Sequence, residues 1–582
     1  MPEGGRGRRL GATFESPLLS LPALALIVVA FVVPLAILVV YSFWPTVQGV
    51  IIHRFTLDNY SEFFTSSTYR SSLARSFAFV GIASALTSLV TFPFAYFVAT
   101  KVHPRRRMLW ILAATVPFFT SYLIRVFIWV NLLGDAGLAN DILQRTRLID
   151  SPLSLLAPGR PAVVITFIYL LFPLTFLTTY IVIERMDAAT LEAAADLGAR
   201  PWRSLLHVTL PVARTGVIGG FIFAFITMMG DYVTPQFVGG TAGTLYSNLI
   251  VNQFGVSLEW GFGSALAILL LLSIGLLLAV LRLAGRRVES AGEYTGGFTK
   301  RRSPLLLSYS ILILTYLYAP IALLVLLSFN DAEYIGLPFN GFTSRWFVQV
   351  FDDPVIADAL FTSLKVAGIS VAISLVLGTI AAIQLARWRG RTRNLTLATI
   401  AMPLFLPPVV IGLAIIIGLN ALGMQRGLWT IVLGHTVLAL PLVVLLVMAR
   451  LEGLDRNQEL GALDLGARPW QALVYVTLPQ ALPGIVAAAM IAFATSMDEF
   501  IMTFLVTGSQ TTLPLYIYGS MRFGATPALA VISSLVLVSS FILILLGAAI
   551  EIGRHRTVRR ERPPAVVAPE AGRVGIRREA RS

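Results

Sequence analysis

Charged side chains inside long apolar runs are the residues of this sequence whose types could do chemistry, since a charge at bilayer depth is costly and usually has a functional or pairing reason. With the aromatic residues around them, they are Arg125, Trp129, Asp231, Tyr232, Asp498, Glu499 and Phe500. Negative charge beside aromatic faces suits the passage of an ammonium group, by charge attraction and cation–π contact. The set therefore predicts a translocation pathway for a cation. The competing interpretation is that these acids end helices near the outer surface and are solvated or paired.

The depth of these charges follows from helix geometry, because a helix rises about 1.5 Å per residue. Arg125 and Asp231 stand at similar depth if their runs are continuous helices, so an ion pair between them is geometrically possible. The run at 395–419 has no matching arginine, so Glu499 is expected to have no such partner. Prolines interrupt two runs, where kinked or unwound turns are expected: Pro117, Pro403, Pro407 and Pro408.

Several other chemistries are excluded by composition. The chain has no cysteine, and its five histidines lie far apart, so thiol catalysis and clustered metal sites are not expected. None of its lysines follows a glycine, so it contains no Gly-Lys-Ser/Thr phosphate loop, and it has no HExxH or GxSxG motif. We therefore expect no enzyme and no cofactor in this chain. Any ATP and Mg²⁺ must be bound by a partner subunit.

The elements that position these residues are predicted to be helices that cross a membrane. Hydrophobic residues make up 56% of the 582-residue chain and charged residues only 13%, and runs of about 20 apolar residues match a hydrocarbon core roughly 30 Å thick. About twelve spans are expected: 17–43, 73–100, 108–133, 162–183, 215–238, 262–283, 305–329, 364–386, 395–419, 430–449, 484–507 and 526–550. The fold class is therefore an all-α polytopic membrane protein.

The net charge of +14 is a topology signal and does not indicate nucleic-acid binding. Short basic segments such as 101–107 and 387–393 fall on one side of the predicted spans, and the positive-inside rule makes that side cytoplasmic. Because the number of spans is even, both termini are expected in the cytoplasm. The arginine-rich tail at 551–582 is predicted to be solvated and disordered, with contact to anionic lipid as the alternative.

An internal repeat divides the sequence into two parts. Residues 191–211 read LEAAADLGARPWRSLLHVTLP and residues 459–479 read ELGALDLGARPWQALVYVTLP, with 13 of 18 positions identical from Ala194 to Pro211 at an offset of 268. The repeat predicts two six-span halves, related by a pseudo-twofold axis along the membrane normal. The predicted boundaries are 1–283 for the first half, 284–304 for a cytoplasmic linker and 305–550 for the second half, with the repeated loops at 187–211 and 455–479.

The repeated loop is predicted to form a short helix, a glycine turn and a second short helix. Gly198 is placed to end the first helix in the left-handed conformation, and Pro201 suits the first turn of the second. One such loop could be a structural turn only. Two copies at matched positions favour a surface for docking a partner.

These loops resemble the EAA signature of permease subunits of ABC importers. Carried over by position, the matching residues are Glu192, Ala193, Ala194, Gly198, Leu210 and Pro211 in the first half and Ala462, Gly466, Leu478 and Pro479 in the second. In that family the loops are coupling helices seated in clefts of two cytoplasmic ATPase subunits. The second copy departs from the pattern, because Glu459 stands one residue early, about 100° around a helix.

The resemblance extends over both halves. FTLDNYSEFF (55–64) and MGDYVTPQFVGG (229–240) look like the first permease of spermidine/putrescine importers, and LPPVVIGLA (406–414) and MDEFIMTFLVTG (497–508) look like the second. The resemblance implies a fused polyamine permease of the bacterial inner membrane. Its implied partners are an ABC ATPase dimer, an extracytoplasmic substrate-binding protein and membrane lipid. Related permeases for ferric iron, thiamine or phosphonate, and a 6+6 secondary transporter, are the alternatives. A secondary transporter has no reason to carry two docking loops.

Overall fold

The computed structural model describes residues 17–134, 137–186, 190, 193–194, 196–285, 303–333, 335, 339–523, 526–539 and 542. Glu192, most of the predicted linker and the whole basic tail lie outside these residues. The chain divides into two compact units, residues 1–540 and 541–582, and every element below belongs to the first.

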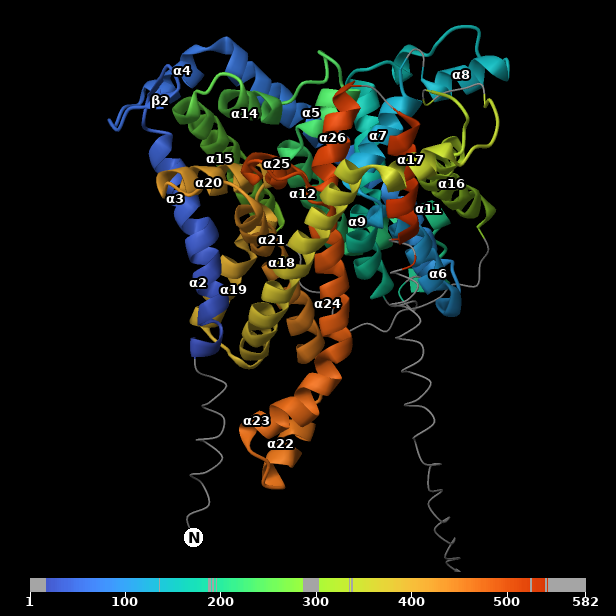
Figure 1. Cartoon of the computed structure of the whole chain (residues 1–582). Coiled ribbons are helices and arrows are strands. Elements are labelled where there is room, and N and C mark those ends of the chain that lie inside the picture. The colour runs from blue at the N-terminus through green and yellow to red at the C-terminus, as the bar shows by residue number, and fades with distance from the viewer. Residues whose placement is uncertain are drawn as a thin grey trace, which may run out of the picture. The chain divides into compact units, whose positions relative to one another are not determined.

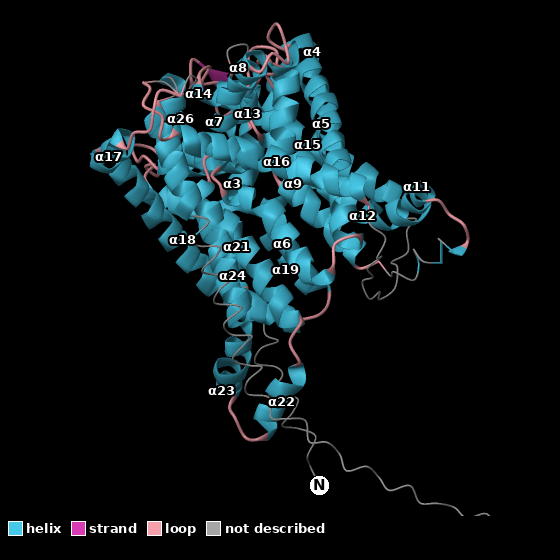
Figure 2. Ribbon diagram, turned by 90° about the vertical axis from the view of Figure 1, so that its right-hand side faces the viewer, coloured by secondary structure: helices cyan, strands magenta, loops and turns pink. Residues whose placement is uncertain are grey.

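Helices account for nearly all the regular structure of the described residues (Figures 1 and 2). The first part of the chain contains η1 (Pro17–Leu19), α2 (Leu21–Ile27), η2 (Val28–Val32), α3 (Val33–Tyr41), β1 (Thr46–Val47), β2 (Val50–Ile51), α4 (Asp58–Thr65), α5 (Ser67–Thr100), α6 (Pro104–Thr115), η3 (Val116–Phe119), α7 (Tyr122–Leu132), α8 (Leu138–Arg145), η4 (Ser154–Leu156), α9 (Arg160–Glu184), α11 (Pro201–Ser204), η5 (Leu205–Thr209), α12 (Leu210–Gly230), α13 (Val233–Val238), α14 (Tyr246–Gly255) and α15 (Trp260–Gly285). The second part contains α16 (Pro304–Leu327), α17 (Arg345–Asp352), α18 (Pro354–Arg387), α19 (Arg391–Ala401), η6 (Met402–Phe405), α20 (Pro408–Ala421), α21 (Leu428–Glu452), α22 (Arg456–Asp464), α23 (Pro469–Ala472), η7 (Leu473–Thr477), α24 (Leu478–Asp498), α25 (Ile501–Val506) and α26 (Leu513–Phe523).

The expected all-α polytopic fold is confirmed. In the described residues, nine helices are long and apolar enough to cross a membrane, or up to eleven if each of two bent helix pairs is one span. The last expected span, 526–550, is described only as a helix over Pro527–Ser539. The two short strands form an antiparallel hairpin in which Thr46 pairs with Ile51.

The third and ninth expected spans are broken where prolines stand. The chain bends by 81° between Pro104–Phe118 and Tyr122–Leu132, and by 105° between Arg391–Phe405 and Pro408–Ala421. Proline lacks a backbone N–H and restricts the residue before it, which favours a break at these positions, whereas α5 and α9 continue through Pro93 and Pro173. The interruptions expected from the prolines are confirmed.

The fifth and eleventh expected spans, 215–238 and 484–507, are also broken, which the sequence prediction missed. Helix α12 ends at Gly230 and α13 begins at Val233, and α24 ends at Asp498 and α25 begins at Ile501. Neither break contains a proline. The prediction of two continuous helices was therefore wrong, and the acidic residues lie at the breaks.

The first helices of each predicted half pack against helices of the other half. Helices α2 and α3 contact α18, α19 and α20, and Figure 1 shows α3 beside α20. Helix α16 contacts α5 and α7. The Tyr309 hydroxyl donates to the carbonyl of Val90 at 2.5 Å, and the Tyr316 hydroxyl donates to that of Ile165 at 2.5 Å. The two parts are thus held together by the first helices of each part, which pack against the other part.

The second repeated loop lies at one end of the helix bundle. In both views α22 and α23 are at the end opposite to α4 and α14 (Figures 1 and 2). The long helix α24 connects this loop to the break at Glu499.

Replacing Gly418 by Ala is expected to weaken the packing of α3 on α20. A Cβ there would lie 2.8 Å from Cγ of Pro34, and overpacking against a rigid ring typically costs about 1–3 kcal/mol. Gly368→Ala is the control, because nothing lies within 4 Å of its added Cβ, and alanine should there stabilise the helix by roughly 0.5–1 kcal/mol. Thermal unfolding of the two purified variants should shift in opposite directions; equal shifts would contradict the packing.

Candidate functional site

Two helix breaks from the two parts of the chain face each other through aromatic side chains. Tyr232 follows the first break and Phe500 the second, and their ring centroids are 6.4 Å apart. Phe504 and Tyr518 complete the cluster, with Phe500 and Tyr518 centroids 4.5 Å apart. Tyr232 and Phe500 are each only 1% exposed. Four aromatic rings therefore fill the space where the breaks meet.

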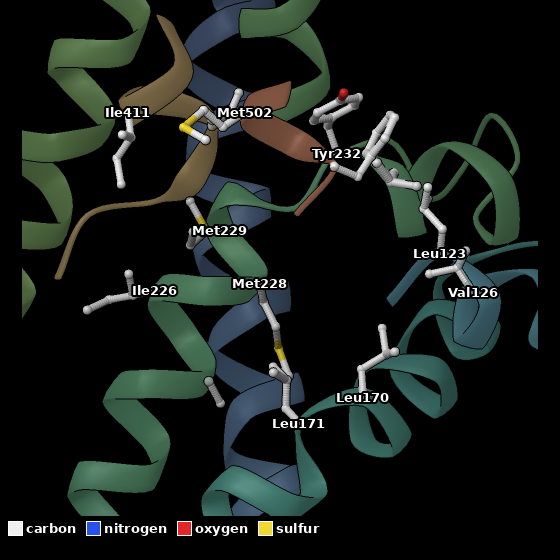
Figure 3. Packing of buried hydrophobic residues seen from close by; sticks show 14 of the residues in the cluster. Leu123, Val126, Leu170, Leu171, Ile226, Met228, Met229, Tyr232, Ile411 and Met502 are labelled. Atoms are coloured by element: carbon white, nitrogen blue, oxygen red, sulfur yellow. The ribbon is translucent and has the colours of Figure 1, made fainter. Parts of the chain in front are cut away.

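Buried aliphatic and sulfur-containing side chains surround the breaks. Figure 3 shows this packing around Tyr232, with Leu123, Val126, Leu170, Leu171, Ile226, Met228, Met229, Ile411 and Met502. An apolar, water-poor surrounding strengthens the interaction of any charge at the breaks.

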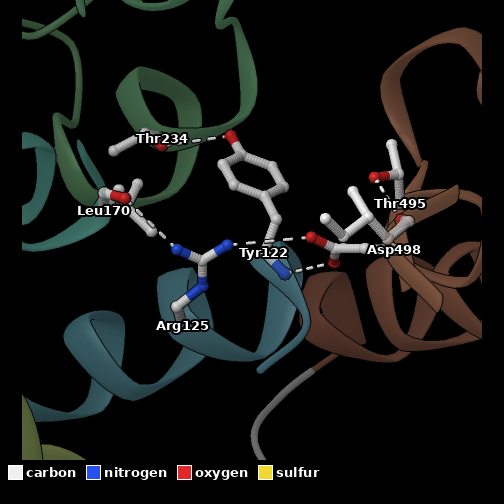
Figure 4. Close-up of polar contacts among 7 residues, drawn as sticks. Tyr122, Arg125, Leu170, Thr234, Thr495 and Asp498 are labelled. Carbon is white, nitrogen blue, oxygen red and sulfur yellow. Dashed lines mark hydrogen bonds and ion pairs between the residues drawn. The ribbon is translucent and has the colours of Figure 1, made fainter. Parts of the chain in front are cut away.

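Arg125 is paired with Asp498 and not with Asp231, so the geometrically possible pair named above is not the one formed. The Arg125 guanidinium lies 3.7 Å from the Asp498 carboxylate, and it donates to the carbonyl of Leu170 at 3.3 Å (Figure 4). Arg125 is 4% exposed. The pairing differs because α12 ends at Gly230, which turns Asp231 toward the start of α13.

Asp498 also caps helix α7 from another part of the chain. Its carboxylate accepts the backbone N–H of Tyr122, the first residue of α7 (Figure 4). A carboxylate at a helix N-terminus satisfies a free amide and interacts favourably with the helix dipole. Asp498 is therefore a structural partner of α7 as well as of Arg125.

Asp231 is saturated by hydrogen bonds. Its carboxylate accepts the amides of Val233 at 2.8 Å and Thr234 at 3.0 Å, so it caps α13. It also accepts the hydroxyls of Thr234 and Tyr122, each at 2.6 Å. Asp231 is 4% exposed. The position of Asp231 agrees with the competing interpretation of the sequence, in which these acids stand at helix ends and are paired.

Glu499 is the least engaged of the three acids. Its carboxylate accepts the amide of Met502 at 2.9 Å, and it has no ion-pair partner among the described residues. Its side chain is partly exposed, unlike that of Asp231. Backbone amides, those of Met502 and Ile501, are therefore its only hydrogen-bond partners among the described residues.

Trp129 belongs to a different aromatic cluster. Its ring packs on Tyr169 and Tyr316, with centroids 5.4 and 5.5 Å away, on the interface between α7, α9 and α16. Of the residues predicted to line one pathway, Tyr232, Glu499 and Phe500 are together, Arg125 and Asp498 form an adjacent pair, and Trp129 lies apart.

The two repeated loops have the predicted glycine turns. Gly198 has φ of 80° and Gly466 has φ of 90°, both in the left-handed region. The Ala199 amide donates to the carbonyl of Ala194 at 3.0 Å, and the Ala467 amide donates to that of Ala462 at 3.1 Å. These bonds close each helix end in the manner of a Schellman motif. The local structure inferred from Gly198 is confirmed.

Both loops lead into a long helix through the same geometry. A five-residue π-helical turn, η5 or η7, precedes α12 and α24. Leu210 and Pro211 begin α12, and Leu478 and Pro479 begin α24. The Leu-Pro pair thus marks the start of the helix that ends at each acidic break.

Glu459 is turned into the protein. Its carboxylate lies 2.7 Å from Arg387, at the end of α18, and accepts the hydroxyl of Thr477 at 3.0 Å. A cavity of about 440 Å³ adjoins this contact. The shifted glutamate thus ties α22 to α18 and η7.

Two exposed leucines of the loops were not selected from the sequence. Leu197 is 89% exposed and Leu465 is 91% exposed, and each directly precedes a left-handed glycine. Their identity across the repeat was a visible signal. The structure adds that both side chains are open to a partner.

Comparison with known proteins decides the family. A family described as "Binding-protein-dependent transport system inner membrane component" matches residues 91–290 and again 374–554. The chain belongs to this family. The permease is 33% identical over 273 residues to the putrescine transport system permease protein PotI of Escherichia coli, which covers 45% of this chain and 97% of PotI.

Two other relatives have related names. The spermidine/putrescine transport system permease protein PotB of Haemophilus influenzae is 34% identical over 238 residues, covering 40% of this chain and 82% of PotB. The corresponding PotC of Escherichia coli is 31% identical over 234 residues, covering 40% and 88%. In the described part of the permease, no group of acids and histidines is placed to hold a metal ion.

Replacing Asp498 by Asn is expected to destabilise the permease, because it leaves the Arg125 charge buried without its carboxylate. The expected cost is about 2.5–3.5 kcal/mol, the range for a charge at the centre of a membrane helix. The double variant with Arg125→Gln should recover much of this loss in thermal unfolding. Asp331→Asn is the matched control: its pair with Arg345, at 3.1 Å, is exposed, so the loss should stay below about 1 kcal/mol. Equal losses for the two Asp→Asn variants would refute the buried pair.

Proposed function

We propose that this permease is the membrane subunit of an ATP-driven importer for polyamines. The three relatives described above are named as putrescine or spermidine/putrescine permeases, and this is the observation that carries the substrate assignment. A polyamine is a flexible chain with several ammonium groups. Ferric iron, thiamine and phosphonate remain the alternatives for related permeases, and none of them is named for these relatives.

The chemistry at the breaks supports a cationic substrate. Asp231 is saturated as a helix cap and Asp498 is paired with Arg125, which leaves Glu499 as the acid able to receive an ammonium group. The faces of Phe500 and Tyr232 beside it favour a cation by a cation–π contact. We assign Glu499 as the station at which the substrate charge is balanced during passage.

The aromatic cluster is proposed to close the pathway between substrate molecules. Tyr232 and Phe500 stand at matching positions of the sequence repeat and contact each other across the two parts of the chain. Opening requires these parts to separate at the breaks. The rings then become available to the substrate they had excluded.

Energy for this opening is proposed to come from an ATPase dimer bound at the two loops. The exposed side chains of Leu197 and Leu465 provide two similar contacts, as a dimeric partner needs. The loops lie on the cytoplasmic side in this proposal, with both termini and the 284–304 linker, and a substrate-binding protein delivers polyamine to the opposite side. Each six-span half then presents one docking loop.

Replacing Glu499 by Gln is expected to reduce polyamine uptake by about tenfold or more, since one lost charge contact of about 1.4 kcal/mol corresponds to a factor of ten. Assembly with the ATPase should be unchanged. Uptake of radiolabelled putrescine into proteoliposomes containing the whole complex measures the effect.

The control for this variant is Glu333→Gln, the same change on an exposed loop, which should leave uptake intact. Full uptake by the Glu499 variant would remove the acidic station. Uptake of an anionic substrate by the wild-type complex would overturn the polyamine assignment.

Replacing Leu197 and Leu465 by Asp is expected to detach the ATPase. Burying a leucine side chain is worth about 1.5–3 kcal/mol, so each change should weaken the complex by roughly tenfold or more. Co-purification and transport-coupled ATP hydrolysis measure this loss. Leu148→Asp is the control, because Leu148 is 72% exposed on a different loop. Retention of the ATPase by the double Leu→Asp variant would argue against docking at these loops.

A further inference from the structure

His435 forms a buried polar bridge across the break that holds Glu499. It lies on α21 and is 3% exposed. Its Nδ1 is 2.6 Å from the hydroxyl of Ser496, which precedes the break, and its Nε2 is 2.8 Å from the hydroxyl of Thr503, which follows it. One imidazole thus joins the end of α24 to α25.

The hydrogen-bond network selects one tautomer of this imidazole. Thr503 donates its hydroxyl proton to the carbonyl of Glu499 at 2.9 Å, so it must accept a proton from Nε2 of His435. Nε2 therefore carries the hydrogen, and Nδ1 accepts from Ser496. Ser496 is also 3.3 Å from the hydroxyl of Ser370 on α18. The neutral Nε2–H form satisfies both hydrogen bonds of the imidazole.

This chain of hydrogen bonds ends on Glu499, the acid proposed to bind the cation. The Glu499 carbonyl, released where the helix stops, is bound by Thr503, and the Glu499 carboxylate caps the same short helix at Met502. Buried backbone groups at membrane depth need such partners. His435 therefore limits the conformations open to Glu499 through Thr503.

The first break is held differently. At the offset of the sequence repeat, Phe167 stands in place of His435, Met228 in place of Ser496 and Pro235 in place of Thr503. The carbonyl of Asp231 is instead bound by the hydroxyl of Ser247 at 2.7 Å. The histidine bridge thus occurs at the break whose acid is bound by backbone amides alone, and not at the break whose acid also accepts two hydroxyls.

We propose that His435, as its Nε2–H tautomer, is a positioning residue that orients Glu499 toward the ammonium group of the substrate. It acts through Thr503 and does not touch the substrate. The inference rests on the proposed role of Glu499 as the cation station.

A double-mutant cycle between His435 and Glu499 tests this role, with putrescine uptake by the reconstituted complex as the readout. His435→Phe copies the first break and removes both hydrogen bonds, so uptake should fall by roughly two- to tenfold, the range for one or two lost hydrogen bonds. Thr503→Val should cause a similar loss. In the Glu499→Gln background, neither change should reduce uptake further.

Conservative variants separate positioning from folding. His435→Gln keeps an N–H donor near Thr503, and Thr503→Ser keeps the hydroxyl, so both should retain most uptake. Thr436→Val is the matched control for Thr503→Val, because the Thr436 hydroxyl bonds only within its own helix, to the carbonyl of Val432 at 2.7 Å. That variant should transport normally.

The outcomes are distinguishable. A full additional loss from His435→Phe in the Glu499→Gln background would overturn the positioning role, while the proposed function stands. Full uptake by Glu499→Gln alone would overturn the cation station and this inference with it. A loss of uptake in Thr503→Ser as large as that in Thr503→Val would also contradict the hydrogen-bond chain.

Discussion

The backbone groups released by four broken helices are the constraint on which this structure depends. In the hydrocarbon region no water is available to bind a free N–H or C=O, so each break needs side-chain partners. Asp498 provides one for the amide of Tyr122, Asp231 for those of Val233 and Thr234, and Glu499 for that of Met502. The three acids therefore first stabilise three of the four broken helices.

This constraint narrows the chemistry that the same acids can perform. A carboxylate that already accepts several hydrogen bonds, as Asp231 does, offers little to a passing cation. Asp498 is occupied by Arg125. Glu499 combines partial exposure with contacts to backbone amides alone in the described chain, and it is the acid to which we assign cation binding.

In the two similar parts of the chain, the helix that precedes the acidic break ends in different contacts with the other part. Where Asp498 of α24 binds the start of α7, its counterpart Gly230 of α12 packs on Pro407, and an added Cβ at Gly230 would lie 2.6 Å from Cβ of that proline. One junction is polar and charged, and the other is apolar and close. A repeat in sequence thus carries two distinct junctions, because the partner at each break comes from the other part of the chain.

The sequence by itself determined the membrane class, most spans, the repeated loops, the left-handed turn at Gly198 and the proline breaks, because each depends on local composition or on one residue's backbone preference. Only the tertiary structure decided that α12 and α24 stop at the acids, that Arg125 binds Asp498 and that His435 spans the second break. Those features depend on contacts between residues far apart in the chain. Hydropathy and helix rise do not encode such contacts. The partner of a buried charged residue comes from a distant part of the chain, and only the packing of the helices brings it close.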